Sequence, residues 1–528
     1  MSLARPGVYI SETLLPAPIQ TIGGANAAGA VIGAFAQGPE TVTLVRSWYD
    51  FTRQFGGYNA LFPATFGVAQ FFQNGGSELY VHRVLGSGAA AATVTIPSTV
   101  SGTNLGSVSS LNRGAAGNNL RVQITKVGNG SFYNVTVYKE VAASELGTNN
   151  ANATNDVVVE QFTNVTFDDA TVSSYAQEVI NNTSSTISMT LTDTGAPAVQ
   201  AITAVLPLTG GSDGAAPVAA DFSDIVPADG TSTFDTLDRP LVIFAPELVT
   251  KFTLDGDSSA EAHAQEVQQS LLEWASAGLG FAVIDTAPGK SVADAIAYAT
   301  NFTATSQGAV YYPNIYIQDP LSRGGRGLRK VGPAGSVAGL YLATDAKAGP
   351  FKAPAGISAS IRSAVSLERA FTPADLDSLN TGVYTVGGTV NYGTAVNAIR
   401  NVPGAGIVTM GARTLLQDGT ANRYVNMRRS LIYIKKRLTD STQFALFENN
   451  GEKLWGKLNT VISVFLNEYR NQGGLRGTTP SQAYYVKVDA ENNTPESIAN
   501  GEVHIEVGVA LEYPAEFVVI NLSQTTGL

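Results

Sequence analysis

Two amphipathic helices are predicted near the end of the chain, where apolar side chains recur every three or four residues. That spacing lines them up on one face of a helix, which can then be buried. The two stripes are Met427, Leu431, Ile434 and Leu438, and then Leu454, Leu458, Val461, Phe465 and Tyr469. Gly473-Gly474 follows the second stripe, and glycine there can take the positive φ that ends many helices.

Apolar and polar residues then alternate, which is typical of strands. Residues 483–489 and 502–509 show this alternation, and a short helix is predicted from Pro495 between them. The chain closes on residues 516–522, Glu-Phe-Val-Val-Ile-Asn-Leu, a strongly β-prone run with almost nothing after it. We therefore expect an α+β unit followed by an extended strand.

Both ends of the chain have this character, because residues 6–12 also form a short β-like run. A seven-residue strand gains about five hydrogen bonds at about 1 kcal/mol each, whereas ordering it costs about 1–2 kcal/mol per residue. Side-chain burial must make up the difference, which favours strand addition between subunits. The predicted contact residues are Val8, Tyr9, Ile10, Phe517, Val518, Val519, Ile520 and Leu522.

Between the ends, strands and helices alternate in two blocks. In the first block we predict helices over residues 47–55, with Ser47 as N-cap, and 64–73, then a buried strand over 78–85. The second block has predicted strands at 241–244, 281–285 and 314–318, and predicted helices at 260–277, 292–300, 337–346 and from Thr372-Pro373. This alternation predicts a largely parallel sheet.

The segment between the two blocks is rich in Thr, Val, Ser, Asn and Gly. Alternating strands are predicted at residues 120–125 and 132–138 around a Gly128-Asn-Gly130 turn, and one helix at 174–180. This composition indicates an inserted, mainly-β domain.

The expected fold class is therefore an α/β core with an inserted mainly-β domain, an α+β C-terminal domain and extended N- and C-terminal arms. The expected divisions are an N-terminal arm over 1–29, a discontinuous α/β domain over 30–85 plus 236–405, the insert over 86–235, the C-terminal domain over 406–512 and a C-terminal arm strand over 513–528.

Composition narrows the possible functions. Only 14% of the 528 residues are charged, against a usual value of about 25%, so we expect much of the surface to be buried against partners. No long apolar run or secretory leader is recognisable, so neither membrane insertion nor export is expected. The chain has no cysteine, which excludes disulfides, thiolate metal sites and a cysteine nucleophile.

The net charge of the chain is −11, and the charged residues are unevenly distributed along the sequence. Residues 141–270 hold eighteen acidic residues against two basic ones, whereas residues 411–440 reverse the balance. The seven bases of the second segment are Arg413, Arg423, Arg428, Arg429, Lys435, Lys436 and Arg437. They are compatible with a solvated helix face, with pairing to the chain's own acids, or with a surface that meets an acidic partner. Nucleic acid is disfavoured, because the pI is about 4.9 and aromatic residues are not interleaved for base stacking.

Three signals resemble enzyme chemistry, and each has a simpler interpretation. Gly210-Gly-Ser-Asp-Gly214 matches a nucleophile elbow, but Ala215-Ala-Pro217 follows where a helix is required, so we interpret it as a loop. Pro288-Gly-Lys-Ser291 lacks the first glycine of a P-loop, so Ser291 is interpreted as a helix N-cap. His263, near Glu261 and Glu266, would need further ligands from elsewhere to hold a metal. No catalytic, cofactor-binding or metal-binding residue is therefore assigned.

Several motifs resemble one known family, the contractile tail sheath proteins of tailed phages and related injection machines. At the start these are Pro6-Gly-Val-Tyr-Ile-Ser-Glu12, Phe55-Gly-Gly57 and Asn74-Gly-Gly-Ser-Glu-Leu-Tyr-Val81. Nearer the end they are Met410-Gly-Ala-Arg-Thr-Leu415, Arg423-Tyr-Val-Asn-Met-Arg-Arg429, Gly474-Leu-Arg-Gly477, Ala483-Tyr-Tyr-Val486, Asn493-Thr-Pro495 and Pro514-Ala-Glu-Phe517. Met410 departs from the tryptophan that is expected in many relatives.

The resemblance implies a structural subunit and not an enzyme, with no cofactor. Such a subunit polymerises as a helical sheath of stacked rings around an inner tail tube and contracts to drive the tube through the envelope of a target cell. Its implied partners are further copies of itself, the tail tube protein, and baseplate and tail terminator proteins. It is implied to assemble in the bacterial host cytoplasm and to reside in the virion tail.

The resemblance also implies an arrangement of parts. The insert is expected to lie on the outside of the sheath, and both arms are expected to add strands to the C-terminal domains of neighbouring subunits. Independently of the resemblance, the charge pattern makes the basic residues from Arg413 to Arg437 our candidate for the tube-facing surface. A bacteriocin of the R type or another contractile injection sheath fits equally well. From different classes, a surface-array protein or a hydrolase built on Ser212 stays open.

Overall fold

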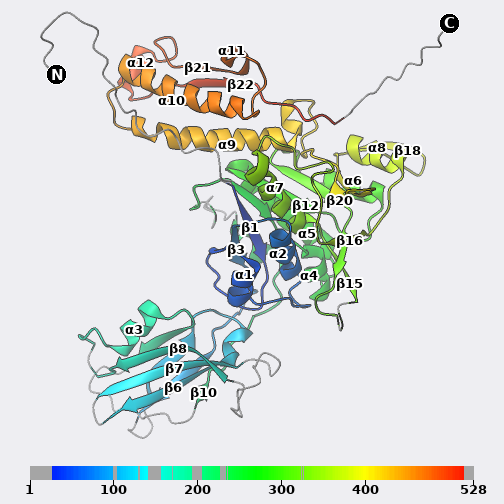
Figure 1. Ribbon diagram of the computed structural model, residues 1–528. Helices are drawn as coiled ribbons and strands as arrows, with labels where there is room; N and C mark the ends of the chain where they lie inside the picture. The colour runs from blue at the N-terminus through cyan, green and yellow to red at the C-terminus, as the bar shows by residue number, and fades with distance from the viewer. Residues whose placement is uncertain are drawn as a thin grey trace, which may run out of the picture.

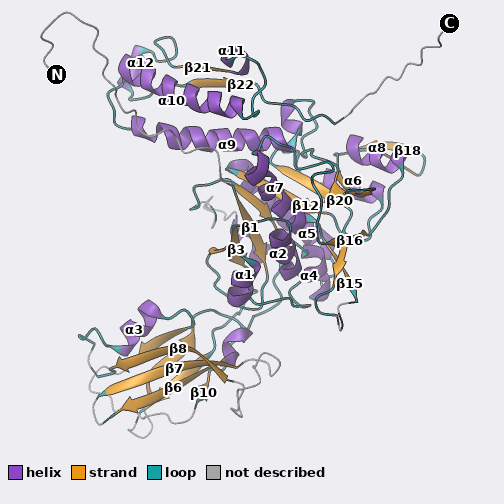
Figure 2. Ribbon diagram, in the orientation of Figure 1, coloured by secondary structure: helices purple, strands orange, loops and turns teal. Residues whose placement is uncertain are grey.

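The computed structural model describes residues 27–98, 104–128, 131–140, 156–168, 170–192, 205–225, 234, 236–322, 324 and 326–516. Figures 1 and 2 show three parts: a central part built on a large sheet, a β-rich part, and a mainly helical part formed by residues near the C-terminal end. The β-rich part is formed within the segment between strands β3 (Leu79–Arg83) and β11 (Leu241–Phe244), with core residues from Ala92 to Leu208. The fold is therefore mixed α/β.

The central sheet has eight strands in the order β2-β3-β1-β11-β12-β13-β19-β20. Besides β3 and β11 they are β1 (Ala28–Gly33), β2 (Thr43–Val45), β12 (Gly280–Asp285), β13 (Gly308–Tyr312), β19 (Asn397–Val402) and β20 (Gly406–Thr409). The six inner strands run parallel, and the two edge strands are antiparallel to their neighbours. β1 pairs with β11, so the sheet joins segments that lie on either side of the β-rich part in the sequence.

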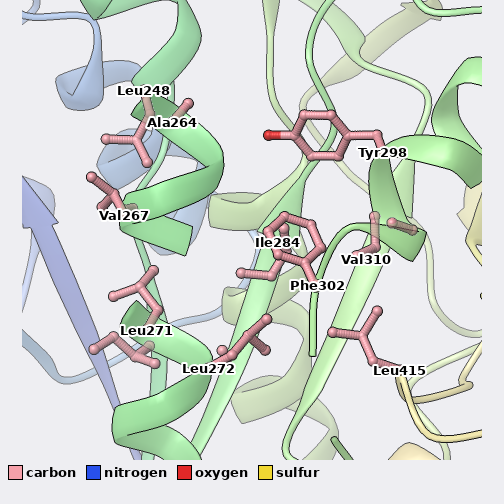
Figure 3. Packing of buried hydrophobic residues seen from close by; sticks show 14 of the residues in the cluster. Leu248, Ala264, Val267, Leu271, Leu272, Ile284, Tyr298, Phe302, Val310 and Leu415 are labelled. Carbon is pink, nitrogen blue, oxygen red and sulfur yellow. The ribbon is translucent and has the colours of Figure 1, made fainter. Parts of the chain in front are cut away.

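Successive residues of the inner strands enter opposite cores. In β11, Val242 and Phe244 join one buried cluster, whereas Leu241 and Ile243 join the other. Helices α1 (Trp48–Phe55), α2 (Ala64–Gln73) and α7 (Ala334–Ala348) contribute to the first cluster, and α4 (Leu248–Leu254), α5 (Ala260–Ala277), α6 (Val292–Thr300) and α8 (Pro373–Thr381) to the second. Figure 3 shows part of the second cluster. Both faces of the sheet are thus covered, as a parallel sheet requires.

Glycines bring α7 close to α2. A Cβ atom on Gly335 would lie 2.1 Å from the Gly67 carbonyl oxygen, and one on Gly339 would lie 2.2 Å from the Phe71 carbonyl oxygen. Real Cβ atoms do not approach backbone so closely, so these positions require glycine for the two helices to pack.

The β-rich part contains two antiparallel sheets that share one buried core. One sheet holds β4 (Thr93–Pro97), β5 (Asn104–Ser110) and β9 (Ile187–Leu191), and the other holds β6 (Leu120–Val127), β7 (Phe132–Glu140), β8 (Asp156–Val165) and β10 (Leu206–Pro207). The part also has helix α3 (Ala176–Thr183) and a 3-10 helix, Ala115–Asn119.

Two small sheets flank the central part. They are the three-stranded sheet of β14 (Ile315–Gln318), β15 (Leu328–Val331) and β16 (Ala364–Leu367), and the hairpin of β17 (Val383–Val386) and β18 (Thr389–Tyr392). The helical part holds α9 (Val425–Thr442), α10 (Glu452–Asn471), α11 (Pro480–Ala483), β21 (Tyr484–Lys487), α12 (Pro495–Ala499) and β22 (Glu506–Val509). Its core cluster contains residues of both predicted apolar stripes, including Met427 and Phe465.

The expectations for individual elements were met in most cases. The helices predicted over residues 64–73, 260–277 and 292–300 have the predicted bounds, and Ser47 and Ser291 are N-caps. Ser291 forms a capping box with Asp294, as the interpretation of that motif required.

Two strand expectations need correction. The strand predicted over residues 314–318 corresponds to β14, but it pairs antiparallel in the small sheet, and the unpredicted β13 takes the place beside β12. The strand predicted over 502–509 begins only at Glu506. The Asn493 side chain accepts a hydrogen bond from the His504 backbone nitrogen at 2.7 Å and donates to the His504 carbonyl at 3.0 Å, which holds that backbone out of the ladder.

Two carboxyl groups are buried together at the start of α7. The Ala334 backbone nitrogen donates to Asp285 Oδ1 at 2.6 Å, the Gly332 nitrogen donates to Glu247, and Thr250 Oγ1 donates to Glu247 Oε2 at 2.9 Å. Burial, and then the charge of nearby Glu247, holds the pKa of Asp285 well above its usual range, and burial also raises the pKa of Glu247. The pair therefore favours protonation in the folded state.

A carboxyl group with a raised pKa stabilises the fold fully at pH values below its ordinary pKa, and this contribution is lost as the pH rises through the raised value. We expect the thermal stability of the protein to fall as the pH rises above the ordinary pKa of a carboxyl group, for this reason. Asp285→Asn keeps an acceptor for Ala334 but cannot ionise, so it should gain on the order of 1 kcal/mol at alkaline pH and flatten the profile. Thermal melts at several pH values test this. Asp377→Asn, at an exposed position, is the control and should leave the profile unchanged.

Candidate assembly sites

The two-stranded sheet of β21 and β22 has edges that can accept another strand. In its antiparallel ladder, the Ala510 nitrogen donates to the Ala483 carbonyl at 2.8 Å. Backbone groups alternate in such a ladder, so those of Val507 and Val509 point away from β21. Among the described residues this sheet contains no third strand, so each strand has one edge without a neighbouring strand.

The faces of this sheet differ. Val486, Val507 and Val509 pack against the core cluster of the helical part, whereas Tyr485 on the opposite face is 54% exposed. The Asn459 side chain of α10 donates to the Val486 carbonyl at 3.2 Å, which covers part of the β21 edge. The β22 edge is therefore the more open of the two.

The residues predicted to add strands lie outside the described part of the chain. These are Val8, Tyr9, Ile10, Phe517, Val518, Val519, Ile520 and Leu522. The strand-addition hypothesis therefore stays a prediction for the arms, and the structure contributes only the β21–β22 edges.

Several of the seven basic residues pair with carboxylates of the same chain. This pairing was one of the alternatives that the sequence left open. Arg429 of α9 is buried and donates to Asp345 of α7 at 2.9 Å, with its guanidinium 4.8 Å from the centroid of the Tyr341 ring. Lys436 is also buried, and its Nζ lies 2.8 Å from Asp238. These two residues therefore tie α9 to the central part and do not belong to an exposed surface.

The other five basic residues are distributed over different surroundings. Arg413 forms an ion pair with Glu516, and Arg428 donates to Gln307. Arg423 and Arg437 lie over the rings of Tyr424 and Tyr433, at 4.9 and 5.5 Å from the ring centroids. Lys435 is exposed to solvent. Of the seven, Lys435 is thus the residue most available to a partner.

The residues that resembled enzyme motifs are held in structural contacts. Ser212 pairs with Ala90 in an isolated β-bridge, and Asp213 of the same loop accepts from the Ala115 nitrogen at 3.0 Å. His263 Nδ1 lies 2.6 Å from Asp257 Oδ2. Glu261 pairs with Lys290 at 2.6 Å. Within the described residues there is no group of three or more His, Cys, Asp and Glu side chains placed to hold a metal ion.

One functional candidate was missed in the sequence analysis. Arg83, at the end of β3, is fully buried and donates to the carbonyls of Phe35 at 3.0 Å, Gly38 at 2.9 Å and Arg113 at 2.7 Å, with Asp213 3.7 Å away. It thus links the central part, through Phe35 and Gly38, to loops of the β-rich part, through Arg113 and Asp213. The sequence signal that could have identified Arg83 is a charged residue at the end of the apolar run that forms β3.

A groove of about 520 Å³ lies between the central part and the segment that follows β22. Its lining includes Ala398 of β19, Met410, and residues 512–516. The same groove borders Phe351 and Asn426. The segment leading to the C-terminal arm therefore runs along the central part and not away from it.

None of the helices in the described residues has both the length and the apolar character needed to span a membrane.

Comparisons with known proteins agree with this architecture. No family model matches the chain. A tail sheath protein of Vibrio phage KVP40 is 26% identical over 248 residues, which is 46% of this chain and 32% of that protein. The chain therefore matches about a third of the length of this curated relative.

Solved structures match over nearly the whole chain. The anti-feeding prophage baseplate in its contracted state is 18% identical, with a TM-score of 0.59 and 99% of both chains covered. The contracted sheath complex of the extracellular contractile injection system PVC is 19% identical, with a TM-score of 0.55 and coverage of 100% and 99%. A sheath tail protein from Listeria innocua is 12% identical, with a TM-score of 0.59 and coverage of 92% and 95%.

The chain is thus a mixed α/β protein with the fold of contractile sheath proteins. The resemblance to contractile tail sheath proteins that the sequence motifs indicated is confirmed by these structures and by the phage relative.

The Arg429–Asp345 pair should matter for stability rather than for partner binding. We expect Arg429→Leu to destabilise the protein by about 3–5 kcal/mol, because Asp345 would be left charged and buried without a partner. The double variant Arg429→Leu/Asp345→Leu should recover most of this loss. Urea unfolding, together with hydrogen exchange of α9, measures both. Lys435→Leu on the same helix serves as the control and should change stability by less than about 0.5 kcal/mol. An equal loss in the single and double variants would contradict the assignment.

Proposed function

We propose that this chain is the structural subunit of a contractile tail sheath. It polymerises as a helical sheath around an inner tail tube and contracts to drive that tube through the envelope of a target cell. The observation that supports this most strongly is a fold match over at least 92% of the chain to several contractile sheath proteins. The sheath of a bacteriocin or of another injection system would perform the same contraction in a different particle.

The surface of the molecule is consistent with a polymer subunit. The charged fraction of the whole sequence, 14%, is low, and β21 and β22 each have an edge without a strand beside it in the described residues. We propose that residues 6–12 and 516–522 of neighbouring copies add to these edges as extra strands. Main-chain hydrogen bonds would supply affinity, and the alternate side chains of the added strand would supply specificity.

The proposed division of labour follows the parts of the chain. Residues 30–85, 236–405 and 406–512 would form the sheath wall, and the insert over 86–235 would lie on its outer surface. The N-terminal arm over 1–29, up to the start of β1, and the C-terminal arm over 513–528, beyond the contact of Glu516 with Arg413, would act as links. Contraction requires that the folded domains of neighbouring subunits can pack against one another in two different arrangements. The arms would keep neighbours joined while the bodies change contacts. The free energy would be held in bistable subunit interfaces, so the proposed mechanism uses neither a nucleotide nor a metal ion.

The proposed partners include the tail tube, and baseplate and tail terminator proteins at the two ends of the sheath. The exposed Lys435, with the partly exposed Arg423, Arg428 and Arg437, is the part of the basic segment proposed to face the tube. The particle would assemble in the cytoplasm of a bacterial host and form part of a virion tail.

Polymerisation is tested by negative-stain electron microscopy of the purified full-length protein over a range of concentrations. We expect hollow tubes with a helical repeat. Two truncations, one lacking residues 1–20 and one lacking residues 514–528, should remain folded by circular dichroism but form no tubes, because each removes one proposed linking strand. Ordered tubes from either truncation would show that the missing arm is not a link. Flat two-dimensional sheets would favour a surface-array protein instead.

Tube contact is tested by charge reversal at an exposed position. Lys435→Glu should weaken co-sedimentation with the purified inner tube several-fold at low salt, and less at high salt, because exposed charges are screened. Lys453→Glu, an exposed lysine on α10, is the comparison variant. If both variants bound the tube like the wild type, the basic segment would not be the tube-facing surface.

A further inference from the structure

The segment after β22 crosses from the helical part to the central part. We name residues 510–516 the strap. At its start, the Ala510 nitrogen bonds to the Ala483 carbonyl beside β22. Further along, the Glu512 carbonyl accepts from Asn426 of α9 at 3.3 Å, and the Tyr513 ring contacts that of Tyr424 edge to face, with centroids 6.1 Å apart. The strap therefore lies over the first turn of α9.

The strap ends in an ion pair with the central part. Arg413 Nε donates to Glu516 Oε1 at 3.0 Å, and Arg413 Nη2 donates to Glu516 Oε2 at 2.6 Å. Nη1 donates to the carbonyl of Asn380, at the end of α8, at 2.9 Å. The two charged side chains are only 14% and 20% exposed. Bidentate charge-assisted pairs of this kind are strong and directional.

Arg413 is itself fixed to the central sheet through its backbone. Its nitrogen donates to Asn397 Oδ1 at 2.7 Å, and Asn397 Nδ2 donates back to the Arg413 carbonyl at 2.8 Å and to the Val310 carbonyl at 3.1 Å. Asn397 is buried at the start of β19, and Val310 belongs to β13. A Cβ atom on Gly411 would lie 2.6 Å from Asn397 Oδ1, so glycine is required for this approach.

We propose that the Arg413–Glu516 pair is the anchor through which a pull on the C-terminal arm enters the central sheet. Two motifs singled out in the sequence, residues 410–415 and 514–517, meet at this pair. A pull transmitted through the chain beyond Glu516 reaches the anchor before it reaches Tyr513, Leu511 or β22. The central sheet therefore takes up the pull, and the two-stranded sheet keeps its pairing. The transmission of a pull rests on the proposed function, whereas the anchor itself does not.

The anchor is tested on the unassembled full-length protein, at a concentration below that at which tubes form, by electron paramagnetic resonance. The chain has no cysteine, so Ala515→Cys, at an exposed position of the strap, takes a single nitroxide label. We expect a restricted spectrum in the otherwise unchanged protein and a mobile one after Glu516→Gln or Arg413→Gln. The swap Arg413→Glu/Glu516→Arg should restore restriction, which a general folding defect would not allow. Glu512→Gln, four residues before Glu516 in the strap, is the matched control. A spectrum unaffected by Glu516→Gln and Arg413→Gln would overturn the anchor.

The transmission of the pull is tested on assembled tubes. Tubes of Glu516→Gln should form, because both arms are intact, but should dissociate at a lower urea concentration than wild-type tubes, and the charge swap should restore resistance. Equal resistance of Glu516→Gln and wild-type tubes would overturn transmission through the pair, even with a mobile spin label. Failure of the wild type to form tubes would count against the proposed function, and the spin-label result would still decide whether the anchor exists.

Discussion

The parallel pairing of β1 with β11 is the contact on which the rest of the architecture depends. These strands are neighbours in the sheet although the whole β-rich part lies between them in the sequence. Their side chains are buried on both faces, so the pairing brings together α1, α2 and α7 on one side and α4, α5 and α6 on the other. The chain leaves the sheet at the end of β3, where Arg83 binds carbonyls on both sides of the junction. It re-enters at the start of β11, which lies at the opposite end of these parallel strands.

Charge has a structural function in the interior of this protein. Arg83, Arg429 and Lys436 are buried, and each is bonded to carbonyl or carboxylate oxygens from other elements. Each of these residues lies where two parts of the molecule meet. Such contacts are directional and are costly to leave half made, so they hold the orientation of the parts more tightly than apolar contact alone.

Local patterns were sufficient to predict many elements. The apolar stripes of α9 and α10, the capping residues Ser47 and Ser291, and the bounds of α5 and α6 depend on interactions within a few residues. The pattern was insufficient for β13, whose run Gly-Ala-Val-Tyr-Tyr is short and is uniformly buried. Such a run carries no alternation, because both of its faces are covered by helices.

The predicted sites show the same division. A cluster of bases along residues 411–440 was visible in the sequence, but which of them stay exposed depends on Asp345 and Asp238, which lie far away in the chain. The anchor is similar, because Arg413 and Glu516 belong to separate motifs whose contact no local pattern encodes.

The sequence by itself determined the periodic elements, the absence of thiol chemistry, the β-prone ends and the resemblance to contractile tail sheath proteins. These follow from residue types and from spacings that act over one or two turns of chain. Only the tertiary structure decided which strands are neighbours, which charges are buried, and that the strap crosses onto the central sheet. Those outcomes depend on contacts between residues distant in sequence, and their free energies arise from burial and geometry that exist only once the chain has folded.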